Sequence, residues 1–276
     1  MNRLPLQKRA QILGMLVEGN SLRATSRMAD CSINTVTKLL EEVGFACNVY
    51  QAEKVRNLTT RQVQVDEIWA FCYSKEKNVA PEHKGILGHG DVWTYTALDA
   101  DTKLMVSYMV GKRDADYALA FMTDLAARFA NRVQLTTDGH QPYLRAVPDA
   151  FGSDIDYAML VKHYGAPNGR SDERRYSPAH LLGTEQKALI GTPDMSKVST
   201  SYVERQNLTM RMSMRRFTRL TRGFSKKVEN LEHAVSLHSM HYNFARIHKT
   251  LRVTPAMEAG ISDHVWTLEE IAALAA

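Results

Sequence analysis

The order of the elements expected between residues 61 and 161 constrains the fold of this chain more than any other feature. Alternating apolar residues there predict strands, and apolar residues at helical spacing predict a helix over residues 114–131. Five strands are expected over residues 62–73, 91–99, 103–110, 132–137 and 155–161. The order β-β-β-α-β-α-β-α predicts an α/β fold in which a mixed five-stranded sheet carries helices on its faces.

Composition limits the class of protein. A chain of 276 residues, of which 44% are apolar, can bury a large core, most simply as one sizeable domain with a smaller appendage. The net charge of +5 is modest, so the distribution of charge is more informative than the total. Cys31, Cys47 and Cys72 match neither a disulfide framework nor a CxxC zinc site, which predicts a reducing compartment. We expect a cytoplasmic protein, because the sequence contains no run of 18 apolar residues and no apolar signal region.

Residues 1–45 have the pattern of a small all-α helix-turn-helix unit. A first helix is expected within residues 4–19, and two more after Ser21 and after Ser32, because serine is a favoured helix N-cap. The third helix is the one that would enter a DNA major groove. Its candidate base-contacting residues are Asn34, Thr35, Thr37 and Lys38. Packing against another protein is the alternative role of such a unit.

The remaining boundaries follow from changes in pattern. Residues 46–60 lack a clear period and are expected to link the helix-turn-helix unit to a catalytic domain over residues 61–262. Residues 162–198 are polar and rich in Gly and Pro, so we expect an inserted hairpin or a loop that contacts DNA. Residues 263–276 are expected to form a C-terminal amphipathic helix.

Three acidic residues stand in distinctive phrases. Asp66 lies in VQVDEIWAFC, Asp138 in VQLTTDGHQPY, and Glu204 in TSYVERQNLTMRM. Two strand-borne aspartates and a helix-borne glutamate can hold two Mg²⁺ ions, with Mn²⁺ as a substitute, over a phosphodiester. Glu67 is an alternative to Asp66. Periodicity does not choose between the two, and because they point to opposite faces of a strand we expect only one of them to line the site.

The segment after Glu204 is dense in arginine. Residues 205–227 hold eight Arg or Lys side chains and no acid. If residues 200–222 form one helix, Glu204 shares a face with Arg211, Arg215 and Arg222, while Val203, Met210, Met214 and Phe217 share the opposite, buried face. An ordinary solvated helix face is the simpler interpretation, but such faces usually mix both charges. We therefore expect Arg205 and this arginine row to contact DNA phosphates.

Several phrases resemble those of a known family. The strings VDEIWAFC, TTDGH, TSYVERQNLTMRM, LTRGFSKK and YNFARIHKTLRVTPAMEAGI resemble bacterial insertion-sequence transposases of the DDE type, in particular the IS-one-like family. That family is similar in turn to the wider retroviral-integrase superfamily. The resemblance spans roughly residues 60–262 and is most specific around Glu204. One difference is that a zinc ribbon typical of IS-one-like N-termini has no matching cysteines here.

The resemblance implies an RNase H-like catalytic domain with Asp66, Asp138 and Glu204 as its metal-binding catalytic triad. It implies an enzyme that cleaves the ends of an insertion element and joins the 3′-OH to target DNA. Double-stranded DNA and further copies of the chain on DNA are the implied partners, with the bacterial nucleoid as location. Two alternatives remain: an inactive, transposase-derived DNA-binding regulator, and an RNase H-like nuclease that cuts without strand transfer.

Overall fold

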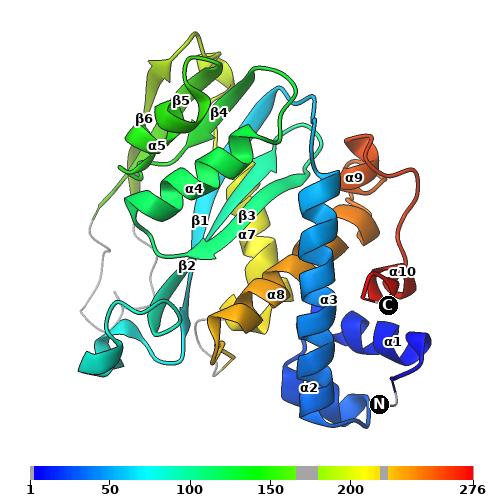
Figure 1. Cartoon of the computed structure of the whole chain (residues 1–276). Coiled ribbons are helices and arrows are strands. Elements are labelled where there is room, and N and C mark those ends of the chain that lie inside the picture. The colour runs from blue at the N-terminus through cyan, green and yellow to red at the C-terminus, as the bar shows by residue number, and fades with distance from the viewer. Residues whose placement is uncertain (1–2, 166–179, 218–222, 276) are drawn as a thin grey trace.

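In the computed structural model, which describes residues 3–165, 180–217 and 223–275, the strands form one sheet. Its six strands lie in the order β3-β2-β1-β4-β5-β6 (Figure 1). Their bounds are β1 Gln62–Cys72, β2 Gly90–Asp99, β3 Met105–Gly111, β4 Val133–Thr137, β5 Ile155–Tyr164 and β6 Leu181–Ile190. No helix in the described ranges is long and apolar enough to cross a membrane.

The pairing of the strands is that of an RNase H-like sheet. β1, β2 and β3 are antiparallel neighbours, whereas β4 and β5 run parallel to β1. The five expected strands agree with β1 to β5 to within three residues at each end. The sheet has one strand more than the five expected, because part of the inserted segment pairs with its edge.

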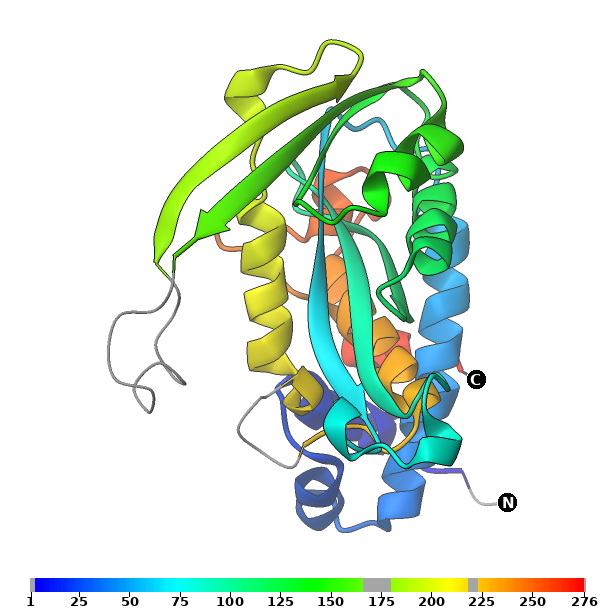
Figure 2. The same ribbon diagram turned by 90° about the vertical axis from the view of Figure 1, so that its left-hand side faces the viewer.

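That additional strand is β6, which lies in the segment 162–198. It is antiparallel to β5, so the expectation of a hairpin is correct for the described part of the segment. Nearly every residue of β6 is exposed on both faces of the strand. Since neither face packs on a core, the sequence does not need the alternation of apolar and polar residues that predicts a strand. The hairpin projects from the sheet beside α7 (Figure 2).

Helices cover both faces of the sheet (Figure 2). On one face, α4 (Ala115–Ala126) and α5 (Tyr143–Phe151) bury Val63 and Val65 of β1. On the other, α7 (Ser201–Ser213) and α8 (Val228–Met240) bury Ile68 and Ala70. The shorter helical segments are η1 Glu76–Asn78, η2 Pro81–His83, η3 Met195–Lys197, η4 Arg215–Phe217, η5 His241–Ala245 and α9 Pro255–Glu258.

The N-terminal unit contains the three expected helices, α1 (Leu6–Val17), α2 (Leu22–Met28) and α3 (Ile33–Lys54). Both predicted serine caps are present: Ser21 accepts a hydrogen bond from the Ala24 N–H at 3.1 Å, and Ser32 accepts one from the Asn34 N–H at 3.2 Å. Each cap satisfies a backbone donor that has no partner within its helix.

The N-terminal unit is joined to the sheet domain by a continuous helix. Residues 46–54, which we expected to belong to a linker, continue α3 to Lys54 and leave a shorter connection before β1. α3 packs along α8, and α10 (Leu268–Ala273) packs on α1, with the Arg9 guanidinium donating to the Ala272 carbonyl at 2.7 Å. Residues 46–54 show no clear helical period because α3 packs against different elements along its length, so its buried residues do not all lie on one face.

Gly44 permits the close contact between α3 and α8. A Cβ atom on Gly44 would lie 2.6 Å from the Cβ of His233 and 2.7 Å from its backbone. We expect Gly44→Ala to lower the free energy of unfolding by about 1–3 kcal/mol, because overpacking outweighs the helix propensity gained from alanine. Thermal or urea unfolding measures this difference. In Gly183→Ala the added methyl has open space, so equal stability losses in the two variants would contradict the packing argument.

Candidate active site

The register of the parallel pair β1–β4 brings two acidic residues together. Val65 pairs with Thr137, so the residue that follows each of them, Asp66 or Asp138, lies beside the other where β4 ends next to the middle of β1. β4 ends at Thr137, and the backbone N–H of His140 donates to the Asp138 carboxylate at 3.0 Å, which fixes that side chain in the following turn. The sheet therefore places two of the three predicted acids side by side at the end of β4, between its two central strands.

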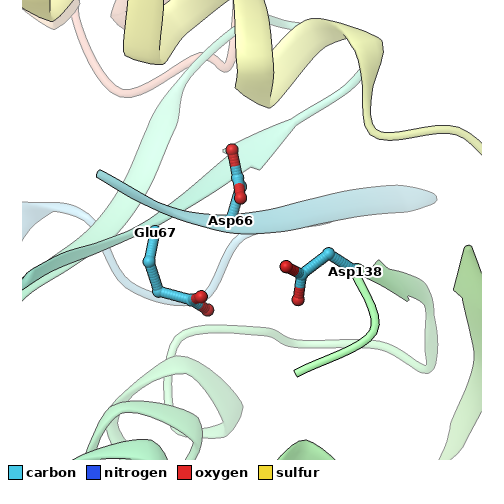
Figure 3. A group of neighbouring side chains, drawn as sticks. All are labelled: Asp66, Glu67 and Asp138. Atoms are coloured by element: carbon cyan, nitrogen blue, oxygen red, sulfur yellow. The ribbon is translucent and has the colours of Figure 1, made fainter. Parts of the chain in front are cut away.

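Glu67 joins this pair, contrary to our expectation. Asp66 and Glu67 do leave opposite sides of β1, and Asp138 lies next to both (Figure 3). One carboxylate oxygen from each of Asp66, Glu67 and Asp138 nevertheless lies within 4.8 Å of those of the other two. The expectation that only one of the adjacent acids lines the site is wrong, because the strand is narrow enough for two carboxylates to converge at its edge.

Arg113 and Tyr143 hold the carboxylate of Glu67. The Arg113 guanidinium donates to one Glu67 oxygen through Nε at 3.1 Å and Nη2 at 3.0 Å, and the Tyr143 hydroxyl donates to the other oxygen. The same Nη2 lies 3.6 Å from an Asp138 oxygen. Arg113 thus connects Glu67 and Asp138 and compensates part of their repulsion.

Asp66 is oriented by α7. The Asn207 amide donates to the Asp66 carboxylate at 2.8 Å, and the Thr96 hydroxyl on β2 donates to the Asn207 amide oxygen at 3.0 Å. Gln64 on β1 accepts hydrogen bonds from the backbone N–H groups of Tyr202 and Val203 at 2.9 and 3.1 Å. Since Thr200 provides no side-chain cap, Gln64 satisfies the first turn of α7 and anchors it on β1.

Glu204 lies in the first turn of α7, near the cluster but outside the 4.8 Å group found among the described residues. Its carboxylate accepts hydrogen bonds from the Lys162 ammonium of β5 and from the Thr200 hydroxyl. The carboxylate is close enough to raise the pKa of both Asp66 and Asp138. The structure therefore brings the three predicted acids into one electrostatic neighbourhood, with Glu204 paired to a lysine.

Burial and mutual repulsion make the cluster costly to ionise. Burial, followed by the charge of Asp138, raises the pKa of Asp66 to about 6. The same two causes raise the pKa of Glu67 to about 7, and burial raises the pKa of Asp138. His140 is buried, which lowers its pKa to about 4, so the imidazole is neutral at pH 7. Such shifts are typical of functional sites.

The charge balance favours a divalent cation. Four carboxylates (Asp66, Glu67, Asp138 and Glu204) face two cationic side chains (Arg113 and Lys162), which leaves two negative charges when all four acids are ionised. Carboxylate oxygens are hard donors that suit Mg²⁺ or Mn²⁺. Oxygens on opposite sides of one Mg²⁺ are about 4.2 Å apart, so small side-chain movements would suffice to close the 4.8 Å group around an ion.

The predicted arginine row is not continuous. α7 ends at Ser213, and Met214 has extended backbone angles, so Arg211 and Arg215 do not share a helix face; Arg222 lies outside the described residues. A helix continued to residue 222 would run about 14 Å past Ser213, whereas the chain must return to pair Ser225 with Cys72 at the end of β1. The buried face is as expected, with Val203, Met210, Met214 and Phe217 all in the core.

The basic side chains after Glu204 differ in exposure. Arg205 and Arg215 are exposed, and Arg211 is half-buried. Arg216 is largely buried, donates to the Ser225 hydroxyl at 2.6 Å, and has its pKa lowered to about 10 by burial. Two of the predicted DNA-contacting arginines are therefore on the surface, and Arg216 is a structural residue.

The predicted groove-reading residues lie in the first turns of α3. Asn34 and Lys38 are exposed, while Thr35 and Thr37 are half-buried, and Thr37 donates to the Ile33 carbonyl at 2.9 Å. Lys38 forms a surface ion pair with Glu42 at 3.8 Å. Asn34 and Lys38 are thus presented to solvent at the start of the helix, as a base-reading role requires.

Sequence reasoning missed the residues that position the acids. Two of them had a local signal: Gln64 shares a strand face with Asp66, and Asn207 follows Glu204 by three residues on a helix. Arg113 and Lys162 come from other parts of the chain and had no such signal. Only the sheet topology places them next to the acids.

Comparison with solved structures finds complexes of the Mos1 transposase. The paired-end complex with the left transposon end has a TM-score of 0.26 and 13% identity, over 57% of this chain and 60% of that one. The strand transfer complex has a TM-score of 0.25 and 14% identity, and the paired-end complex with Mn a TM-score of 0.23 and 14% identity. This chain spans less than two thirds of those chains. No protein-family model and no curated protein sequence matches it.

The raised pKa of Asp66 predicts a pH-dependent cost. The free energy of unfolding falls as pH rises from about 4 to about 6, because in that range Asp66 is ionised in the unfolded chain but still protonated in the folded one. We expect Asp66→Asn to raise the free energy of unfolding at pH 8 by on the order of 1–3 kcal/mol and to have little effect at pH 4. Urea unfolding in EDTA at pH 4, 6 and 8 measures this.

Asp156→Asn is the matched control with the opposite sign. The hydrogen bond from Arg132 lowers the pKa of Asp156, so that carboxylate stabilises the fold above its unfolded pKa. The control should be less stable than the unmodified chain at pH 8. If Asp66→Asn lowered the stability at pH 8 as much as the control does, the ionised Asp66 carboxylate would not destabilise the fold, and the prediction would be wrong.

Proposed function

We propose that this chain is a DDE transposase of the IS-one-like class, which cleaves the ends of an insertion element and joins the 3′-OH to target DNA. One observation carries the proposal: Asp66, within β1, and Asp138, directly after the end of the parallel strand β4, lie side by side under the first turn of a helix that carries Glu204. The phrases around these acids are the ones that resemble the family.

Asp66, Asp138 and Glu204 would hold Mg²⁺, with Glu67 close enough to contribute an oxygen. A bound ion supplies a nucleophile at neutral pH and stabilises charge on the attacked phosphate. The chain's own residues prepare the site for it. Asn207 directs the Asp66 carboxylate, Arg113 restrains Asp138, and Gln64 fixes the start of α7.

Lys162 has a separate role in this proposal. It pairs with Glu204 at the site and is half-buried, so it keeps that acid ordered while offering a cation close to where a phosphate would lie. Arg205 and Arg215 extend the positive charge along the surface beside α7. We infer that duplex DNA crosses this surface and that α3 reads bases through Asn34 and Lys38, with several copies of the chain bound to one pair of ends.

The triad is tested by removing one carboxylate charge at a time. We expect Asp66→Asn, Asp138→Asn and Glu204→Gln each to abolish Mg²⁺-dependent cleavage and joining, because a lost ligand removes several kcal/mol of transition-state stabilisation, and to leave DNA binding within about twofold. A gel assay on a library of DNA ends measures both reactions. Asp91→Asn, at an exposed position near the start of β2, is the control and should remain active.

The same assay decides between the alternatives. A transposase joins a 3′-OH to new DNA, a nuclease only cuts, and a regulator only binds. Near-normal turnover in any one of the three variants would remove that residue from the proposed triad.

The DNA surface is tested by salt dependence. We expect the double variant Arg205→Ala, Arg215→Ala to bind DNA of any sequence more weakly, with a salt slope lower by about one for each lost phosphate contact. Asn34→Ala should instead weaken binding to the element end by about 1–3 kcal/mol relative to unrelated DNA. Arg145→Ala on α5, across the sheet from α7, is the control. An unchanged slope in the double variant would mean that these arginines are only solvated.

A further inference from the structure

The face of β1 that carries Glu67 continues into aromatic side chains. Trp69 and Phe71 follow Glu67 at two-residue intervals, so they point to the same face, about 7 and 13 Å further along the strand. Here β1 and β2 extend beyond α4 and α5 (Figure 1). Both rings are half-buried, whereas Tyr95 of β2 and Tyr143 of α5, which lie between the sheet and the helices on this face, are fully buried. The helices thus leave part of this face open.

Phe224 extends the aromatic surface across the edge of β1. Its ring stacks on Phe71 with centroids 4.8 Å apart and planes 30° apart, and Phe71 lies 5.9 Å from Trp69. The contact is fixed by the backbone: Cys72 and Ser225 form a parallel bridge, and the Tyr73 N–H donates to the Ser225 carbonyl at 2.9 Å. We call Trp69, Phe71 and Phe224 the aromatic row.

Cationic side chains flank the aromatic row. The Lys75 ammonium lies 5.9 Å from the centroid of Phe71, and Arg113 lies 4.7 Å over Trp93, which is paired with Trp69 in the β1–β2 register. Lys226 and Lys227 are exposed just after Phe224. The row therefore runs from the acidic cluster to a group of lysines, with its rings half-exposed in between.

From this arrangement, and resting on the proposed function, we propose that the aromatic row binds unpaired nucleotides of a single DNA strand next to the acidic cluster. Flat rings offer stacking surfaces for bases, and adjacent lysines offer partners for phosphates, which is the combination that single-stranded nucleic acid requires. An intact duplex keeps its base faces stacked inside the helix and cannot use the rings in this way. Binding at the row therefore favours DNA that is opened at the position presented to the acids.

The decisive measurement is binding of a mixed-sequence 12-nucleotide single strand to the full-length chain in EDTA. Trp69→Leu, Phe71→Leu and the double variant keep an apolar side chain but remove the flat stacking surface. We expect affinity to fall about tenfold for each lost ring. The salt slope should stay unchanged in these variants, whereas Lys75→Ala should lower it by about 0.7. Phe45→Leu, at an exposed aromatic on α3, is the matched control and should bind normally.

A second measurement uses the unmodified chain, so it does not depend on the folding of any variant. A single strand carrying 5-iodouracil should photo-crosslink within residues 69–75 or 223–227. Crosslinks confined to other segments would overturn the proposal, as would equal losses of affinity in Phe45→Leu and the double variant. A change of oligomeric state in the double variant without loss of single-strand binding would also overturn it, since the row would then be an interface between copies.

This outcome is separable from that of the proposed function. If the single strand binds and crosslinks at the row while no duplex end is cleaved with Mg²⁺, the nucleotide site stands and the transposase proposal fails. If cleavage depends on Asp66, Asp138 and Glu204 but the ring variants bind the single strand normally, the nucleotide site fails alone.

Discussion

The parallel pairing of β1 with β4 is the constraint on which the candidate site depends. Because Val65 lies opposite Thr137, Asp66 and Asp138 must lie side by side where β4 ends next to the middle of β1. A slip of one residue would move every side chain of β1 to the other face, separating the acids and removing Val63 and Val65 from the core that they form beneath α4 and α5. The hydrophobic effect that fixes the core therefore also fixes the distance between the acids.

Holding carboxylates this close has a cost that neighbouring elements offset. Burial and repulsion raise the pKa values of Asp66, Glu67 and Asp138. Arg113, the amide of Asn207 and the hydroxyl of Tyr143 stabilise the cluster from three different elements or loops. A site of this kind is preorganised for a cation, because its acids are already gathered and only their charge remains to be neutralised.

The N-terminal helices are joined rigidly to the sheet domain. α3 runs without a break from the helix-turn-helix unit to its packing against α8, and Gly44 lets the two helices approach closely. The N-terminal unit, for which we propose a DNA-reading role, therefore has a fixed direction relative to the acids. Base recognition by α3 and chemistry at the cluster would then be coupled by geometry, without the freedom that a flexible linker gives.

The sequence by itself determined strands β1 to β5, the starts of α2 and α3, and the places of Asp66 in β1 and of Asp138 after β4. Local alternation predicts β1 to β5 and serine caps predict α2 and α3, because these signals depend only on neighbouring residues. The tertiary structure decided what depends on distant contacts. It added the exposed strand β6 through pairing with β5, ended α7 at Ser213 so that Ser225 can pair with Cys72, and brought Glu67, Arg113 and Lys162 to the acids. No local period records such contacts, since each joins residues that are far apart in the chain.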